Sequence, residues 1–339
     1  MRSVSRSSTA PGHAARRHSL QLETQASDLS PKQTPYRGVE RMKLSIVIPY
    51  YRAATTVATQ LEALTRQKWS ESWEVVISDN EGSDELTKIA RVFGKRLSSL
   101  RLVDSSDGRG AGHARNAGVE AAKGELIAFC DADDEVGSGW LAAIGSALAE
   151  HEFVACRADI KKLNPEWVQR VFADDLQQWQ LDRLTFPPYL PYAPGSSIGV
   201  RRSVHESVGG FDESWPVHQD TDYCLRIQLS GAKLRFLPEA LIHYRLRTTI
   251  PGLFNRARIW AKYYVRLYER YRSPGTQMPN AWKWQITQLD HLLRSRLDAR
   301  SPSLSTRAAW FVHLGWDIGL LQGSVRYLTS PPPPFAPSD

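Results

Sequence analysis

The feature that most constrains the fold is an alternation of short apolar runs with helical segments between residues 43 and 148. Runs with the make-up of buried strands cover residues 43–49, 73–78, 100–103 and 125–130. Segments with apolar residues at helical spacing stand between them, over 53–67, 86–97 and a stretch that ends at Lys123. Strands that alternate with helices predict a doubly wound, mostly parallel sheet of the Rossmann-like type. We therefore expect an α/β fold.

The fourth apolar run ends in a cluster of acidic residues: Asp131, Asp133, Asp134 and Glu135. Carboxylates this close together repel one another unless a cation or water compensates them. Mg²⁺ and similar hard cations take oxygen ligands, usually one or two carboxylates together with the phosphates of a substrate. The alternative is a solvated acidic turn, which is the better explanation of an isolated D-x-D.

Polar residues also follow two other strands of the predicted sheet. Pro49 and Tyr51 stand at the end of the first strand, and Asp79 ends the second. Ligands of doubly wound sheets gather beyond the carboxyl ends of the strands. These residues are therefore expected to converge with Asp131 and Asp133 on one site.

Charge is distributed unevenly along the chain, whose net charge is +7. Residues 1–43 carry 8 basic and 3 acidic side chains, residues 44–253 carry 23 and 28, and residues 254–328 carry 12 and 4. A nucleic-acid binder would show a basic patch on its folded core, whereas this core is acidic. The pattern favours a metal-using enzyme and excludes nucleic acid as the expected partner.

Composition also suggests where the protein works and how it is divided. Its three cysteines form no C-x-x-C pair, which fits a reducing, cytoplasmic compartment, and no run of about 18 apolar residues predicts a membrane span. Residues 1–42 are rich in Ser, Arg and Pro without periodicity, so we expect disorder there. The expected division is a catalytic domain over 43–250, a helical extension over 251–329 and a disordered tail over 330–339.

Taken together, these segments resemble the family 2 glycosyltransferases, which have the GT-A fold. The resemblance covers roughly residues 44–247 and rests on the order of several motifs. These are Ser45–Tyr51 as the opening strand, Gly112–Gly118 as the helix before the metal motif, Asp131-Ala132-Asp133 as the D-x-D, Gly209–Glu213 as the acceptor-side loop, and Gln219–Asp222 as the E-D-x-D segment.

The resemblance implies a role for each matching residue. The nucleotide-sugar donor would be bound by Pro49, Tyr51, Asp79, Arg115, Asp131 and Ala132. Asp133 and His243 would hold a divalent metal, Mg²⁺ or Mn²⁺. The acceptor side would include Gly210, Phe211, Asp212 and Asp222, and Asp220 would be the catalytic base. An alternative for Asp220 is a helix N-cap, the commoner role of an acid at such a position.

Three departures from the family pattern refine this expectation. Ser78 stands where relatives often carry an Asp, and Gln219 replaces the usual Glu before the base. The Gln-x-x-Arg-Trp element of processive polymer synthases is missing. The resemblance therefore implies a non-processive, inverting transferase, with a saccharide or lipid-linked acceptor and a role in cell-envelope, exopolysaccharide or glycolipid synthesis.

Two other functions are compatible with a similar sheet. A nucleotidyltransferase would carry a basic, glycine-rich phosphate loop after the first strand, but residues 49–54 contain no glycine. A catalytically degenerate GT-A fold that only binds would show its carboxylates far apart.

The last part of the chain suggests contact with a membrane. Residues 254–328 combine a charge of +8 with several tryptophans and tyrosines, among them Trp260, Tyr264, Trp282 and Trp310. Basic residues are attracted to anionic lipid, and these aromatics favour the headgroup region. We expect peripheral docking on the inner face of the plasma membrane. The alternative is that the aromatics pack on the catalytic sheet.

Overall fold

A computed structural model describes residues 42–97, 99–172, 180–272, 281–327 and 329. The segments expected to be disordered, 1–42 and 330–339, lie outside the described residues except for residue 42. The described residues all belong to one compact unit.

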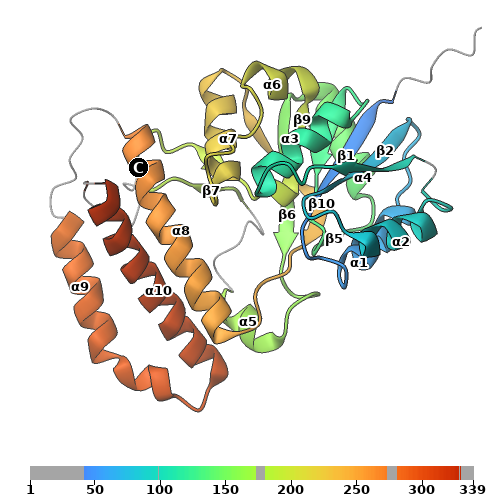
Figure 1. Cartoon of the computed structure of the whole chain (residues 1–339). Coiled ribbons are helices and arrows are strands. Elements are labelled where there is room, and N and C mark those ends of the chain that lie inside the picture. The colour runs from blue at the N-terminus through green and yellow to red at the C-terminus, as the bar shows by residue number, and fades with distance from the viewer. Residues whose placement is uncertain (1–41, 98, 173–179, 273–280, 328, 330–339) are drawn as a thin grey trace, which may run out of the picture. The chain divides into compact units, whose positions relative to one another are not determined.

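The central feature is an eight-stranded sheet with the order β3-β2-β1-β4-β9-β6-β10-β5 (Figure 1). Its strands and those of a separate small sheet, β7-β8, are β1 (Leu44–Tyr50), β2 (Trp73–Asp79), β3 (Leu100–Asp104), β4 (Leu126–Phe129), β5 (Glu135–Val136), β6 (Phe153–Asp159), β7 (Asp182–Arg183), β8 (Pro191–Tyr192), β9 (Ile198–Arg201) and β10 (Leu234–His243). Strands β3, β2, β1 and β4 run parallel, whereas β9 is antiparallel to both of its neighbours. The prediction of a mostly parallel α/β sheet is confirmed.

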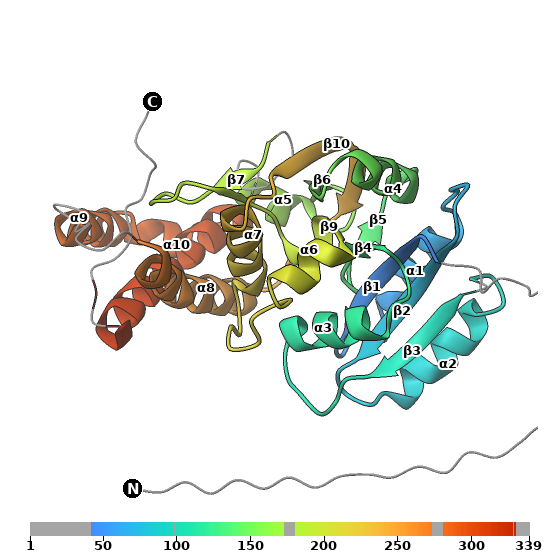
Figure 2. The same ribbon diagram turned by 90° about the horizontal axis from the view of Figure 1, so that it is seen from above.

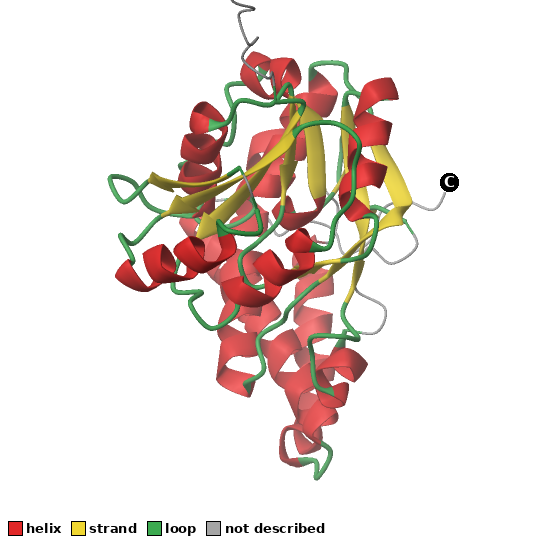
Figure 3. Ribbon diagram, turned by 90° about the vertical axis from the view of Figure 1, so that its right-hand side faces the viewer, coloured by secondary structure: helices red, strands yellow, loops and turns green. Residues whose placement is uncertain are grey.

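Helices pack on both faces of this sheet (Figure 3). They are α1 (Val57–Thr65), α2 (Asp84–Phe93), α3 (Ala111–Ala121), α4 (Trp140–Glu150), α5 (Glu166–Val171), α6 (Arg202–Ser207) and α7 (Gln219–Leu229), followed by α8 (Ile250–Tyr271), α9 (Ala281–Arg294) and α10 (Leu304–Tyr327), with 3₁₀ turns η1 (Gly195–Ser197) and η2 (Arg296–Arg300). Alternate residues of β1 contribute to the apolar cores on the two faces of the sheet, because successive side chains of a strand point to opposite sides. Ile46 and Ile48 belong to the apolar core that includes residues of α1 and α4, and Val47 belongs to the core that includes residues of α3 and α7.

The structure differs from the sequence expectation in the second half of the sheet. The alternating pattern of residues 43–148 predicts strands only up to residue 130, whereas residues 234–243 form one long strand, β10, whose register shifts between Leu237 and Leu241. Strand β6 was not predicted at all. It inserts between β9 and β10, so its pairing depends on segments far away in the sequence.

Helices α8, α9 and α10 lie side by side next to α7 (Figures 1 and 2). Helices α8 and α10 run parallel and in close contact, because three glycines four residues apart on α10 face the α8 backbone. A Cβ at Gly315 would lie 2.5 Å from the Phe254 carbonyl oxygen, and one at Gly323 would lie 2.6 Å from that of Lys262. The third glycine, Gly319, meets the carbonyl oxygen of Arg258 and the Cβ of Ala261.

We expect Gly319→Ala to destabilise the protein. Alanine favours a helix over glycine by up to ~1 kcal/mol, but here its methyl group would overlap backbone atoms of α8, and overpacking costs typically ~1–3 kcal/mol. The net result should be a lower free energy of unfolding, by about 1–2 kcal/mol, measured by urea denaturation. Val325→Ala is the control, because Val325 lies on the same helix and is 72% exposed. Equal stability of Gly319→Ala and the wild type would contradict the tight contact.

Helix α8 is anchored to α7 and to the segment around Phe186 by a largely aromatic cluster. Tyr264, Leu267 and Tyr268 are buried against Phe186 and Leu225. Tyr264 is therefore not available to a membrane surface, contrary to the expectation, whereas Trp282 is 45% exposed. Within the described part of the chain, no helix is long and apolar enough to cross a membrane.

Candidate functional site

The carboxyl ends of four parallel strands meet at one edge of the sheet. The register pairs Tyr50 with Asp79 and Asp79 with Asp104 across β1, β2 and β3. On the other side of β1, Val47 pairs with Phe129, and the Cys130 amide donates to the Val47 carbonyl. The acidic segment that follows β4 therefore begins at the same edge as Tyr50 and Asp79.

Asp131, Asp133 and Asp134 form the one group of candidate metal ligands among the described residues, with ligand atoms within 4.8 Å of one another. Desolvation and the charge of Asp131 raise the pKa of Asp133. Desolvation, with the charges of Asp131 and Asp133, raises the pKa of Asp134 well above its ordinary value. Asp134 was not among the predicted ligands, although it belongs to the same acidic run.

This group fits a hard divalent cation. Its three carboxylates supply the oxygen ligands that Mg²⁺ and Mn²⁺ use. The Oδ2 atom of Asp134 is buried and has no hydrogen-bond partner among the described residues, while its Oδ1 accepts from the Arg245 amide at 2.8 Å. A buried carboxylate oxygen without a partner is costly unless a cation or a proton compensates it.

His243, the other predicted metal ligand, is not in this group. It ends β10, and its Nδ1 atom lies 3.2 Å from the Asp159 carboxylate. Its role as a ligand stays a prediction.

Arg115 connects the acidic segment to Phe211, in the loop predicted to form the acceptor side. It is 2% exposed, and its Nη2 atom donates to Oδ1 of Asp131 at 2.6 Å. Its guanidinium lies over the Phe211 ring, 5.5 Å from the centroid. A Cβ at Gly195 would lie 2.6 Å from the guanidinium carbon, so the absence of a side chain there makes room for Arg115. The Nε and Nη1 atoms of Arg115 have no hydrogen-bond partner within the described ranges.

Asp220 also contacts Gly195, through the backbone amide of that glycine. Its Oδ2 atom accepts from the Gly195 amide at 3.0 Å, and its Oδ1 accepts from the Thr221 amide at 2.9 Å. The N-cap of α7 is His218, so Asp220 is the second residue of the helix rather than its cap. Contacts thus run without interruption from Asp131 through Arg115 and Gly195 to Asp220. Gly195 was not predicted, and nothing in its local sequence indicates this contact.

The Gly209–Glu213 loop is held against α3 by Asn116. The Asn116 Oδ1 atom accepts from the Phe211 amide at 2.8 Å, and its amide group donates to the Phe211 carbonyl at 2.9 Å. Gly210 has φ +69°, and a Cβ there would lie 2.6 Å from Asn116 Oδ1, so only glycine fits. Phe211 is 2% exposed and stacks on Tyr223 of α7, with centroids 4.1 Å apart, so its ring anchors the loop to α7.

The other two predicted acceptor-side acids are engaged by α8. Burial acts against ionisation of Asp212, but hydrogen bonds from Ser214 and the pairing with Arg270 lower its pKa to about 2. Asp222 is fully buried, and it accepts from Arg226 at 2.8 Å and from the Tyr271 hydroxyl at 2.7 Å. Asp222 therefore joins α7 to α8.

The residues predicted to contact the nucleotide lie at the ends of β1 and β2 and next to β4. Asp79 accepts backbone hydrogen bonds from Glu81 and Gly82 at 3.1 Å and from Ser83 at 2.7 Å, so its carboxylate holds the turn after β2. Tyr51 is 57% exposed, whereas Ala132 is 4% exposed. The partly exposed Pro49 pairs with Ser78 in the sheet register. Their contacts with a nucleotide stay predictions.

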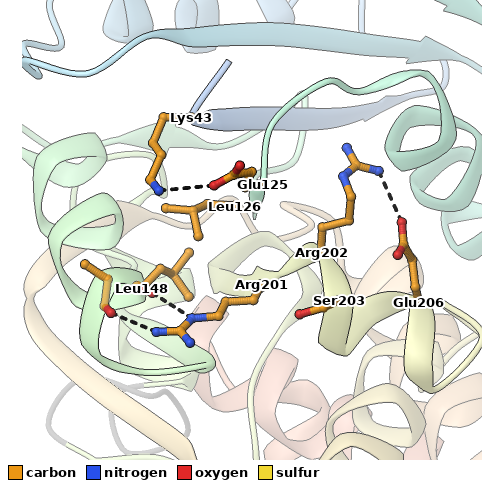
Figure 4. A pocket seen from close by; sticks show the side chains of 9 residues that line it. Lys43, Glu125, Leu126, Leu148, Arg201, Arg202, Ser203 and Glu206 are labelled. Atoms are coloured by element: carbon orange, nitrogen blue, oxygen red, sulfur yellow. Dashed lines mark hydrogen bonds and ion pairs between the residues drawn. The ribbon is translucent and has the colours of Figure 1, made fainter. Parts of the chain in front are cut away.

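A cavity of about 460 Å³ lies at the opposite edge of the sheet, next to the first residues of β1 and β4 (Figure 4). Its charged side chains are already paired. Lys43 contacts Glu125 at 3.2 Å, Arg201 donates to the Leu148 and Ala149 carbonyls, and Arg202 lies 3.8 Å from Glu206. The cavity is therefore distinct from the site at the acidic edge.

We expect the stability contribution of His113 to depend on pH. Its Nδ1 atom lies 2.8 Å from Glu213 and its Nε2 atom 3.0 Å from Asp107, and the hydrogen bond with Glu213, aided by Asp107, raises its pKa. A histidine with a raised pKa stabilises the fold below its unfolded pKa of about 6.5, and this contribution is lost as the pH rises through the folded value.

The measurement is the difference in unfolding free energy between the wild type and His113→Gln, as a function of pH. It should be largest below pH of about 6.5, on the order of 0.2–1 kcal/mol per pair, and should vanish at alkaline pH. His151→Gln, at the end of α4, is the control histidine change. A difference that grows with pH would contradict the assignment.

Comparison with known proteins shows similarity to glycosyltransferases. Residues 45–209 match the family model described as "Glycosyl transferase family 2". The chain is 28% identical over 233 residues to "Uncharacterized glycosyltransferase YibD" of Escherichia coli K12, covering 63% of this chain and 64% of that protein. It is 25% identical over 235 residues to "Amylovoran biosynthesis glycosyltransferase AmsB" of Erwinia amylovora, covering 61% and 71%. The matched region thus spans slightly less than two thirds of YibD.

A solved structure supports the fold. Mannosyltransferase PcManGT from Pyrobaculum calidifontis, solved with GDP-Man and Mn²⁺, aligns with a TM-score of 0.58 and 16% sequence identity, over 84% of this chain and 88% of that one. At this identity the likeness concerns the fold, which is GT-A.

Proposed function

We propose that this chain, whose residues 45–209 match the family 2 glycosyltransferase model and whose fold is GT-A, transfers a sugar from a nucleotide-diphosphate donor to an acceptor hydroxyl, with the aid of a divalent metal. The observation that carries the proposal is the continuous contact from the carboxylate group to Asp220. Asp131 contacts Arg115 at 2.6 Å, and Asp220 contacts the Gly195 amide, whose residue adjoins Arg115, at 3.0 Å. A donor diphosphate and an acceptor base would be neighbours in this arrangement.

The donor side is assigned to four residues. Asp131, Asp133 and Asp134 would hold Mg²⁺ or Mn²⁺, which offsets the negative charge of the diphosphate as it departs. The guanidinium of Arg115, with two nitrogens that lack partners among the described residues, would bind diphosphate oxygens. The hydrogen bond with Asp131 and the contact with the Phe211 ring hold this guanidinium in one orientation.

Asp220 is assigned as the general base. Its carboxylate takes the proton of the acceptor hydroxyl while the oxygen attacks the anomeric carbon, and the bond from that carbon to the diphosphate breaks. Attack opposite to the leaving group inverts the anomeric configuration. We propose one sugar, or few, per encounter. The name of AmsB refers to amylovoran biosynthesis, which supports a role in exopolysaccharide, glycolipid or cell-envelope synthesis.

The first test is a thermal-shift screen of UDP-, GDP-, ADP- and dTDP-sugars, each with Mn²⁺ and with a chelator. We expect one nucleotide class to raise the unfolding temperature in the presence of Mn²⁺ and to lose most of this effect with the chelator. Stabilisation by free nucleoside triphosphates, but by no nucleotide sugar, would favour a nucleotidyltransferase instead. Donor binding without any turnover would favour a binding module.

We also propose that the enzyme is cytoplasmic and docks peripherally on anionic membrane, where it reaches a lipid-linked acceptor. A groove of about 670 Å³ between α8 and α10 supports this, because its cations, Arg258, Lys262 and Arg326, pair with no carboxylate of the described residues. Val325, at the rim of the same groove, is 72% exposed. Basic residues near an anionic surface contribute about 1 kcal/mol each, and salt weakens this attraction.

Sedimentation with vesicles that contain phosphatidylglycerol tests the docking. A truncation before α8 would remove the buried Tyr264, Leu267 and Tyr268, so point variants are the better test. We expect the wild type to sediment at low salt, and the triple variant Arg258→Gln, Lys262→Gln, Arg326→Gln to lose most of this binding. The matched control neutralises three exposed cations of α2 and its C-terminal turn, Lys88, Arg91 and Lys95. Wild-type protein that stays in the supernatant would contradict docking.

A further inference from the structure

Helix α8 belongs to the C-terminal extension, and it contacts both segments predicted to form the acceptor side, the Gly209–Glu213 loop and the start of α7. Arg266 donates to the Ser214 carbonyl at 2.9 Å and lies 4.1 Å from the Trp215 ring centroid. Four residues further along the helix, Arg270 contacts the same loop region and α7. Helix α8 therefore contacts both the Gly209–Glu213 loop and the two residues that directly follow it.

Arg270 bridges the loop and α7 with a single guanidinium. Its Nη1 atom donates to Oδ2 of Asp212 at 2.9 Å, and its Nε atom lies 3.5 Å from Oδ1 of Asp222. Asp212 is in the Gly209–Glu213 loop, whereas Asp222 is in the first turn of α7, two residues after Asp220. Because Asp222 also binds Arg226 and Tyr271, its position is fixed from both helices.

A second contact fixes the start of α7. The buried His218, which precedes the helix with φ +61°, places its Nε2 atom 3.0 Å from the Trp260 carbonyl of α8. A carbonyl only accepts, so Nε2 is the donor. The His218 ring also packs against Trp260 and Tyr264, with centroids 5.1 and 5.8 Å away. Asp220 thus lies between two anchors on α8.

We propose that Arg270 is a positioning residue for sugar transfer. It holds the acceptor-side loop and the first turn of α7 in one fixed relation, so that an acceptor hydroxyl bound at the loop meets the Asp220 carboxylate. This inference rests on the proposed function, because it takes Asp220 as the base. It extends the functional unit from the loop and α7 to a helix of the C-terminal extension.

The test compares Arg270→Met with the wild type. The donor probes are UDP and GDP with Mn²⁺, and the acceptor probes are alkyl glycosides with the nucleotide sugar selected by the screen. Misplacement of reacting groups by about 1 Å costs roughly 100-fold in rate. We expect kcat/KM for transfer to fall by roughly 10- to 100-fold, with an increase in acceptor KM, while nucleotide affinity changes less than about twofold. Release of donor sugar to water should account for a larger share of turnover.

Two further variants separate positioning from loss of structure. Tyr271→Phe removes only the hydroxyl that binds Asp222, so it should give a smaller change in the same direction. Arg272→Met is the control, because Arg272 pairs with Glu269 of the same helix and not with α7 or the loop. Hydrogen exchange of residues 209–222 should increase in Arg270→Met and stay unchanged in Arg272→Met.

The outcomes distinguish this inference from the proposed function. If the wild type transfers no sugar, the proposed function itself fails. If the wild type transfers sugar and Arg270→Met does so equally well, or loses transfer and hydrolysis in the same proportion, the positioning role is overturned and the proposed function stands.

Discussion

Asp133→Asn should abolish metal-dependent donor binding while leaving the protein folded. Asp133 is crowded by two other carboxylates, and desolvation together with the charge of Asp131 raises its pKa. Removing one charge relieves repulsion in the metal-free protein, so its unfolding temperature should stay the same or rise. Removing a ligand should weaken nucleoside diphosphate binding with Mn²⁺ by roughly 100-fold or more, since even outer-shell changes at metal sites cost about 10- to 100-fold.

Isothermal titration calorimetry with and without Mn²⁺ measures this effect. Asp104→Asn is the matched control, because Asp104 ends β3 at the same edge of the sheet but lies outside the carboxylate group. Unchanged affinity of Asp133→Asn in the presence of Mn²⁺ would remove this residue from the metal site.

Asp220→Asn should keep donor binding and lose transfer. A general base contributes about 10²- to 10⁴-fold, and asparagine is isosteric but does not take up the proton. Asparagine keeps one of the two oxygens that accept from the Gly195 and Thr221 amides and replaces the other with an NH2 group, so the local structure should persist with one backbone hydrogen bond fewer. We therefore expect kcat to fall by about 10²-fold or more, with nucleotide affinity unchanged.

If Asp220 only stabilised the start of α7, the Asp220→Asn variant would keep its turnover, because asparagine stabilises such positions about as well as aspartate. Steady-state kinetics of this one variant, with nucleotide titration in parallel, separates the two roles. Asp84→Asn changes an exposed acid in the first turn of another helix, α2, and serves as the control. Turnover of Asp220→Asn within about twofold of the wild type would contradict the base.

The sheet, its carboxyl edge and the acidic segment were predictable because they depend on local patterns. β-Branched runs such as Leu44–Tyr50 specify buried strands, and an acid that follows a strand directly, as Asp131 follows β4, must lie near the edge of the sheet. The match to the family 2 glycosyltransferase model and the GT-A fold, both expected from the order of these motifs, are confirmed.

The remaining features depend on contacts between distant segments. Gly195 adjoins Arg115, which is 80 residues earlier, and nothing in the sequence around either residue specifies this contact. Asp222 was assigned to the acceptor side, but its partner Tyr271 is in a helix whose packing could not be derived from periodicity alone. The glycines of α10 were an available signal: residues 315, 319 and 323 repeat at a helical spacing that allows two backbones to approach.

The most direct test of the central assignment is the release of nucleoside diphosphate from the nucleotide sugar selected by the screen. Wild-type protein should release diphosphate and transfer the sugar in the presence of Mn²⁺, and a chelator should stop both reactions. Asp133→Asn and Asp220→Asn should both be inactive, and only Asp220→Asn should still bind the nucleotide. Transfer at the same rate with chelator, or by Asp133→Asn, would contradict a metal-dependent site at the end of β4.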